Sequence, residues 1–65
     1  MGAQTNIVRM EASELNELYA DRCVWFLNNG RRQAGIIDQF IEGSNVVSIR
    51  RGDDFIEVPR NNVLL

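Results

Sequence analysis

The chain has 65 residues, enough for one small domain, and a domain of this size buries only about 60% of the surface that its unfolded chain exposes. Its single cysteine, Cys23, excludes an internal disulfide, and the lack of histidine together with scattered carboxylates argues against a structural metal site. The net charge of −2, with seven arginines and no lysine, excludes nucleic-acid binding that depends on bulk positive charge.

These exclusions leave a well-packed monomer or an oligomer as ways to stabilise so short a chain. No apolar run approaches the roughly 20 residues that span a bilayer, and no cleavable secretion signal is visible, so no membrane partner is expected. A lone thiol is typical of a reducing compartment, and a cytoplasmic location is expected. No cofactor is expected.

The amino end, residues 1–10, is expected to be loose because its first residues are polar. The stretch at residues 6–10, "NIVRM", could alternatively pair as a strand. A short helix is predicted over residues 11–21, where Leu15, Leu18 and Tyr19 have the i, i+3, i+4 spacing of an apolar helix face.

Residues 23–27 are aromatic and β-branched, which favours a strand, with Cys23 interpreted as a strand-core residue and not as a nucleophile. Asn29-Gly30 predicts a type I′ hairpin turn. A second strand is expected over residues 32–41, in which Gly35 indicates a bend or a close backbone approach, as where a sheet curls into a barrel.

Gly43-Ser44 ends this strand, and further strands are predicted over residues 45–51, 54–58 and 63–65. Pro59 cannot donate to a ladder, so strand pairing is expected to stop there. Five short strands at spacings of roughly 8–12 residues predict a mainly β protein, with a short amino-terminal helix and a strongly bent five-stranded antiparallel barrel. Residues 1–65 are expected to form one domain.

Catalysis is not expected, because Cys23 has no histidine or other plausible base to activate it. Two carboxylate pairs could be proposed as acid and base, but solvated carboxylates are the ordinary finding at turns and strand ends: Asp38 with Glu42, and Asp53 with Asp54. The stretch "GRRQAG" lacks the Lys-Ser/Thr of a P-loop. Arg31 and Arg32 could contact phosphate from the hairpin, or pair with carboxylates of an adjacent subunit.

Two longer stretches carry a family resemblance: "VWFLNNGRRQAGII" followed by Asn45, and "FIEVPRNNVLL". Over residues ~11–65 the chain resembles the Sm-like family, including its Hfq branch. Gly30, Gly35 and Asn45 have the spacing of the family's first motif, and "RNNV" is similar to its second. Apolar residues also stand where the family keeps barrel residues: Val24, Phe26, Ile37, Phe40, Val47 and Ile49.

The resemblance implies a homo-oligomeric ring, hexameric or heptameric, that pairs edge strands and binds single-stranded, uridine-rich RNA near its pore. Carried over to this chain, Asn45 reads a base edge beside Gly43 and Ser44, and Arg60 with Asn61 comes from the second loop. Two positions depart from the family pattern. Gly43 has no ring where a base would stack, and Ile41 replaces the usual Asp. The alternative is an Sm-fold assembly or protein-interaction module without an RNA site.

Overall fold

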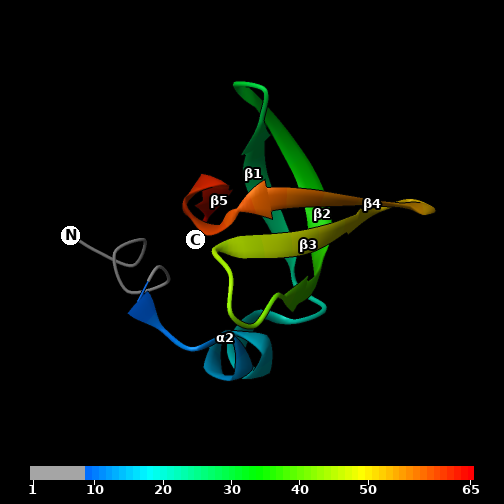
Figure 1. The fold of residues 1–65 in the computed structure, drawn as a ribbon. Helices are drawn as coiled ribbons and strands as arrows, with labels where there is room; N and C mark the ends of the chain where they lie inside the picture. The colour runs from blue at the N-terminus through cyan, green and yellow to red at the C-terminus, as the bar shows by residue number, and fades with distance from the viewer. Residues whose placement is uncertain (1–8) are drawn as a thin grey trace.

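The structure, a computed structural model, describes residues 9–65. Most of the amino-terminal segment for which a loose chain or a strand was predicted, residues 1–8, lies outside the described residues. A short helix precedes five strands and a 3-10 turn, with these bounds: α2 Ala12–Tyr19, β1 Cys23–Asn28, β2 Arg31–Phe40, β3 Val46–Arg51, β4 Asp54–Pro59, η1 Arg60–Asn62 and β5 Val63–Leu64. The strands form one antiparallel sheet in the order β4-β3-β2-β1-β5, with α2 against the end of β2 (Figure 1).

Helix α2 begins with a capping box. The Glu11 side chain accepts the backbone N–H of Glu14, and the Glu14 side chain accepts the N–H of Glu11, which satisfies two donors that a helix start leaves unpaired. Leu15 is fully buried as predicted, but Leu18 is 50% exposed, so the predicted apolar face is partly wrong. Ala12 takes its place in the core. Within residues 9–65, no helix has the length and apolar character to cross a bilayer.

The first hairpin has the predicted turn. Asn29 and Gly30 have φ angles of 55° and 78°, and a type I′ turn needs positive φ at both central residues. Strand β1 then pairs along β2 from Asn28↔Arg31 to Cys23↔Ile36. The turn therefore sets the register that decides which side chains face the core.

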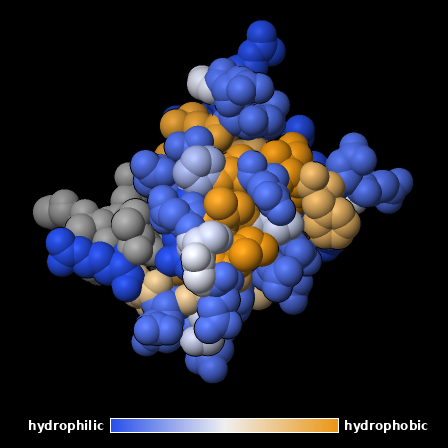
Figure 2. Space-filling view, viewed as in Figure 1, coloured by the Kyte–Doolittle hydropathy of each residue, from blue (hydrophilic) through white to orange (hydrophobic). Residues whose placement is uncertain are grey.

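The core occupies one face of the sheet. All six residues expected at barrel positions are buried there, together with Leu15, Val58 and Val63. Cys23, in contrast, is exposed, and the prediction that it is a core residue is wrong. Successive side chains of a strand alternate between faces, so burying Val24 and Phe26 turns Cys23 and Trp25 outward. Figure 2 shows apolar residues gathered over the strands, with hydrophilic residues around them.

Gly35 is the point of close approach that the sequence predicts. A Cβ atom at this position would lie 2.5 Å from Ile49 Cγ2, closer than such atoms can approach, and 3.2 Å from the Arg50 carbonyl oxygen, which is a tight contact. The register between β2 and β3 also shifts between Ile37 and Gln39, which places a bulge at Asp38. The glycine and the bulge together bring β3 tightly across β2.

The sheet is open, and the predicted barrel is not closed. Strands β4 and β5 are the two edges, and no pairing between them is found among the described residues. The reason is geometric. Strand β5 has only two residues, and it pairs with β1 at Trp25 and Phe26.

Strand pairing stops at Pro59, as predicted, although β4 includes Pro59 and does not end at Val58. Pro59 lies opposite Val46, and the backbone N–H of Arg60 still donates to the Asn45 carbonyl at 2.9 Å. In an antiparallel ladder, a hydrogen bond between the next residues, here Arg60 and Asn45, identifies Val46 and Pro59 as a pair that exchanges no hydrogen bonds. The ladder therefore does not use the N–H that proline lacks.

Candidate nucleic-acid interface

The loop between β2 and β3 carries three of the predicted site residues. It closes where the Ile41 N–H donates to the Val46 carbonyl at 3.0 Å. Inside it, the Ile41 carbonyl accepts the Ser44 N–H at 3.3 Å and the Ser44 hydroxyl at 3.2 Å. These bonds give the four-residue turn a defined shape, with Asn45 exposed directly after it.

Gly43 has a physical role in this turn. Its φ of +79° is the value that the third residue of a type II turn requires, and glycine adopts it without strain. Nothing lies within 4 Å of a Cβ atom built on Gly43. The presence of glycine at this position is therefore explained by backbone conformation and not by lack of space.

Asn45 and Arg60 lie together although 15 positions separate them in the chain. The hydrogen bond from the Arg60 N–H to the Asn45 carbonyl links the end of the β2–β3 loop to the start of η1. It uses backbone atoms only, so the Asn45 amide remains exposed while its main chain is held. The sequence predicts both residues as site members, and the structure places them side by side.

The Arg60 side chain points inward and is only 5% exposed. Its Nη1 donates to the Met10 carbonyl at 2.9 Å, and its guanidinium carbon lies 5.7 Å from the centre of the Phe40 ring. Its Nε is buried and has no hydrogen-bond partner among the described residues. In this position the Arg60 side chain packs on Phe40 at the start of the β2–β3 loop, and it holds the segment that leads into α2 through the Met10 carbonyl.

A shallow depression of about 510 Å³ lies where the β2–β3 loop meets the start of η1. Gly43, Ser44, Asn45 and Arg60 line it, and we refer to it as the Asn45 pocket. Its other lining residues are Arg9, Met10, Glu11, Ala12 and Glu42. Two arginines and two glutamates balance one another, so the pocket does not attract anions through net charge.

The sequence gives no signal for the residues just before the helix. Met10 and Glu11 join the pocket only because Arg60 holds the Met10 carbonyl and because the capping box fixes Glu11. The Arg60–Met10 contact joins segments that are 50 positions apart in the chain. The cap at Glu11 is local, but only the tertiary fold places it beside the pocket.

The remaining predicted contacts lie elsewhere. Asn61 is exposed in η1 but does not line the Asn45 pocket. Arg31 and Arg32 are exposed at the β1–β2 hairpin, at the end of β2 away from α2 (Figure 1). The structure thus divides the predicted residues between two ends of the sheet.

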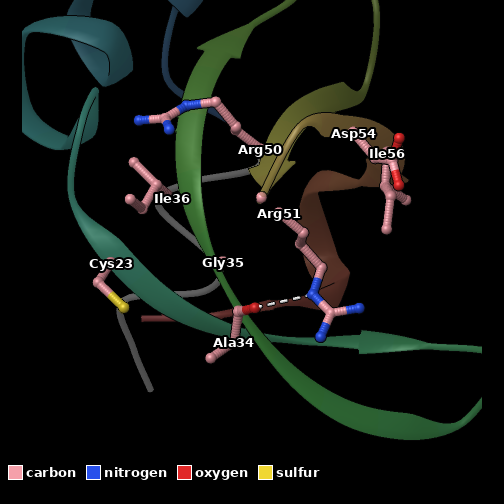
Figure 3. Close-up of a pocket in the computed structure, with 9 residues that line it drawn as sticks. Cys23, Ala34, Gly35, Ile36, Arg50, Arg51, Asp54 and Ile56 are labelled. Atoms are coloured by element: carbon pink, nitrogen blue, oxygen red, sulfur yellow. Dashed lines mark hydrogen bonds between the residues drawn. The ribbon is translucent and has the colours of Figure 1, made fainter.

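A second depression, of about 590 Å³, lies beside Gly35, and we refer to it as the Gly35 groove (Figure 3). Arg51 reaches across it, and its Nε donates to the Ala34 carbonyl at 3.0 Å. Arg50 points away from Arg51 in the same view. This hydrogen bond links Arg51, at the end of β3, to the bend of β2 beside Gly35, so this arginine has a structural role.

Comparisons with protein-family models, with curated proteins and with solved structures returned no match to this chain. Within residues 9–65, no three His, Cys, Asp or Glu side chains are grouped so that they could hold a metal ion. The polar groups available at the Asn45 pocket are the exposed Asn45 amide, the Ser44 hydroxyl, backbone groups and the exposed charged side chains of Arg9, Glu11 and Glu42. Such groups form hydrogen bonds with a planar polar ligand such as a nucleobase.

Proposed function

We propose that this chain is an Sm-like protein that binds single-stranded RNA at the Asn45 pocket. The proposal rests on one observation: Asn45 and Arg60, one from each stretch that resembles an Sm motif, are hydrogen-bonded to each other and line the same pocket. The exposed Asn45 amide offers a donor and an acceptor to the edge of a base, and uracil presents both. Arg60 acts as a positioning residue: its backbone N–H holds the Asn45 carbonyl, and its buried side chain fixes η1 by donating to the Met10 carbonyl.

We also propose that the subunits assemble into a homo-oligomeric ring, and the arrangement of the sheet supports this. The strand order leaves β4 and β5 as edges, and pairing β4 of one subunit with β5 of the next would satisfy both. Phe55 on β4 is 59% exposed, which is a large apolar side chain for a solvated edge. Such pairing would also continue the bent sheet from subunit to subunit, as in an Sm-like barrel.

The test is a titration of fluorescein-labelled oligo-uridine and oligo-adenosine, followed by anisotropy at two salt concentrations. We expect binding that weakens with salt and falls about tenfold in Asn45→Ala, through loss of the base-edge hydrogen bonds. Gln39→Ala is the matched control, because it removes an exposed amide from β2 outside the pocket. Equal losses in both variants, or no binding of either oligonucleotide at micromolar protein, would contradict the proposal.

A second function is an assembly module without an RNA site. The balanced charge of the Asn45 pocket and the absence of a ring at Gly43 favour it. Light scattering distinguishes the two when combined with the titration. A mass that is a multiple of 7.4 kDa with no RNA affinity supports the module. The same mass with Asn45-dependent binding supports the RNA-binding ring.

A further inference from the structure

Leu18 lies on the exposed side of α2 among negatively charged residues. It is 50% exposed, although its side chain is large and apolar. Glu14 precedes it by four positions and so lies on the same side of the helix, and Glu17 and Asp21 are exposed close to it in the chain. Residues 10–21 contain four carboxylates and no basic residue. We refer to Leu18, Glu14, Glu17 and Asp21 as the acidic face.

The β1–β2 hairpin carries a large apolar side chain in the opposite charge environment. Trp25 is 53% exposed, and the Arg32 guanidinium carbon lies 5.8 Å from the centroid of its ring. Arg31 is exposed beside the turn. Residues 23–37 contain these two arginines and no carboxylate. We refer to Trp25, Arg31 and Arg32 as the basic face.

The two faces cannot contact each other within one subunit. Helix α2 is hydrogen-bonded to the Phe40 end of β2, whereas the hairpin lies at the Arg31 end (Figure 1). Ten strand residues separate these ends by about 30 Å. Contacts between exposed opposite charges act over much shorter distances. Each face therefore finds its counterpart only on another molecule.

We propose that the acidic face of one copy of this chain binds the basic face of a second copy. Leu18 then packs on Trp25, and the carboxylates surround Arg31 and Arg32. The contact removes two exposed apolar side chains from water and places opposite charges against each other. It joins two different surfaces, so it is heterologous and can repeat from copy to copy. It uses no residue of the Asn45 pocket or of the edge strands β4 and β5.

A second copy covers both faces better than other occupants do. A nucleic-acid strand would pair with the arginines, but its phosphates would be repelled by the acidic face, and Leu18 would stay exposed. An unrelated protein would need two surfaces of opposite charge, each with an apolar centre, and this chain already carries both. Its net charge of −2 is small, so whole copies do not repel each other strongly.

Light scattering of the full chain, before and after nuclease treatment, tests for this contact. The mass at about 50 mM salt should be at least about twice the mass at about 500 mM, because salt screens contacts between exposed charges. Strand pairing through backbone atoms is not screened in this way, so the mass at high salt reports the ring or the single chain. The emission of Trp25, the single tryptophan, should shift to shorter wavelength at low salt as the indole leaves water.

Charge reversals test which residues form the contact. Arg32→Glu and Glu17→Arg should each raise the protein concentration at half-maximal association at least about tenfold, because like charges then face each other. The double variant exchanges the two charges in every contact, so it should associate within about threefold of wild type.

Arg50→Glu and Asp53→Arg are the matched controls. They make the same charge changes at exposed positions of β3 and of the β3–β4 turn, outside both faces, and should associate within about twofold of wild type. Circular dichroism confirms that each variant is folded.

Any of four outcomes would overturn the contact. The mass could be the same at both salt concentrations. Nuclease could abolish the extra mass at low salt, which would assign it to bridging nucleic acid. Arg32→Glu and Glu17→Arg could associate as their controls do. The double variant could remain as weak as the single variants, which would mean that the two charges do not face each other.

Discussion

The side-chain amide of Asn16 in α2 bonds both backbone groups of Phe40 at the end of β2. Phe40 donates its N–H to Asn16 Oδ1 at 2.6 Å, and Asn16 Nδ2 donates to the Phe40 carbonyl at 3.3 Å. The side chain therefore acts as one more strand residue beside β2. Through this contact the helix is fixed to the strand that leads into the Asn45 pocket.

Asn16→Leu should lower the free energy of unfolding by about 2–4 kcal/mol, because it leaves two partly buried backbone groups of Phe40 without partners. Asn16→Asp keeps the acceptor for the Phe40 N–H and should cost less. Urea denaturation measures both, and Glu17→Gln on the exposed side of the helix is the control. Equal stability of Asn16→Leu and Glu17→Gln would show that the contact is not important.

Arg60→Ala should cost about 2–4 kcal/mol of stability, because it unpairs the Met10 carbonyl and removes the packing on Phe40. Arg50→Ala, the truncation of an exposed arginine, should change stability by no more than about 0.5 kcal/mol. Chemical denaturation compares the two. A similar small change in both variants would mean that the inward arginine contributes little.

Gly35→Ala should destabilise the fold by about 1–3 kcal/mol, because the added methyl group meets Ile49 Cγ2 at 2.5 Å and the Arg50 carbonyl at 3.2 Å. Ile49→Ala removes one of these two clashes, so the double variant should lose less stability than the sum of the single variants. Thermal unfolding of the four proteins gives this coupling. Strict additivity would contradict the close approach.

Gly43→His should add the missing ring to the Asn45 pocket. Space is open there, and stacking contributes about 1–3 kcal/mol per base, so affinity for oligo-uridine should rise about tenfold. The positive φ should lower stability by about 1–2 kcal/mol.

Gly52→His is the matched control for this change. Gly52 also has a positive φ, +62°, and open space around its Cβ position, but it belongs to the β3–β4 turn. It should show a comparable loss of stability without any gain in affinity. A gain in both variants would point to a general effect of the added imidazole and not to the pocket.

The sequence by itself determined the helix, the five strands and the first turn. Their signals are local: Asn29-Gly30 requires positive φ, and alternating side chains mark the core face of a strand. Gly35 was likewise predicted as a close approach, because a glycine inside a strand has few other uses. Leu18 and Cys23 were misplaced, since apolar character alone does not say which face of an element is covered.

Only the tertiary structure decided how the strands end and what the candidate site contains. Whether the sheet closes depends on where β5 pairs, and that strand is too short to carry a register signal of its own. The inward direction of Arg60 depends on the Met10 carbonyl, 50 positions away in the chain. Contacts of this kind are made between distant segments, so the physical chemistry of neighbouring residues cannot specify them.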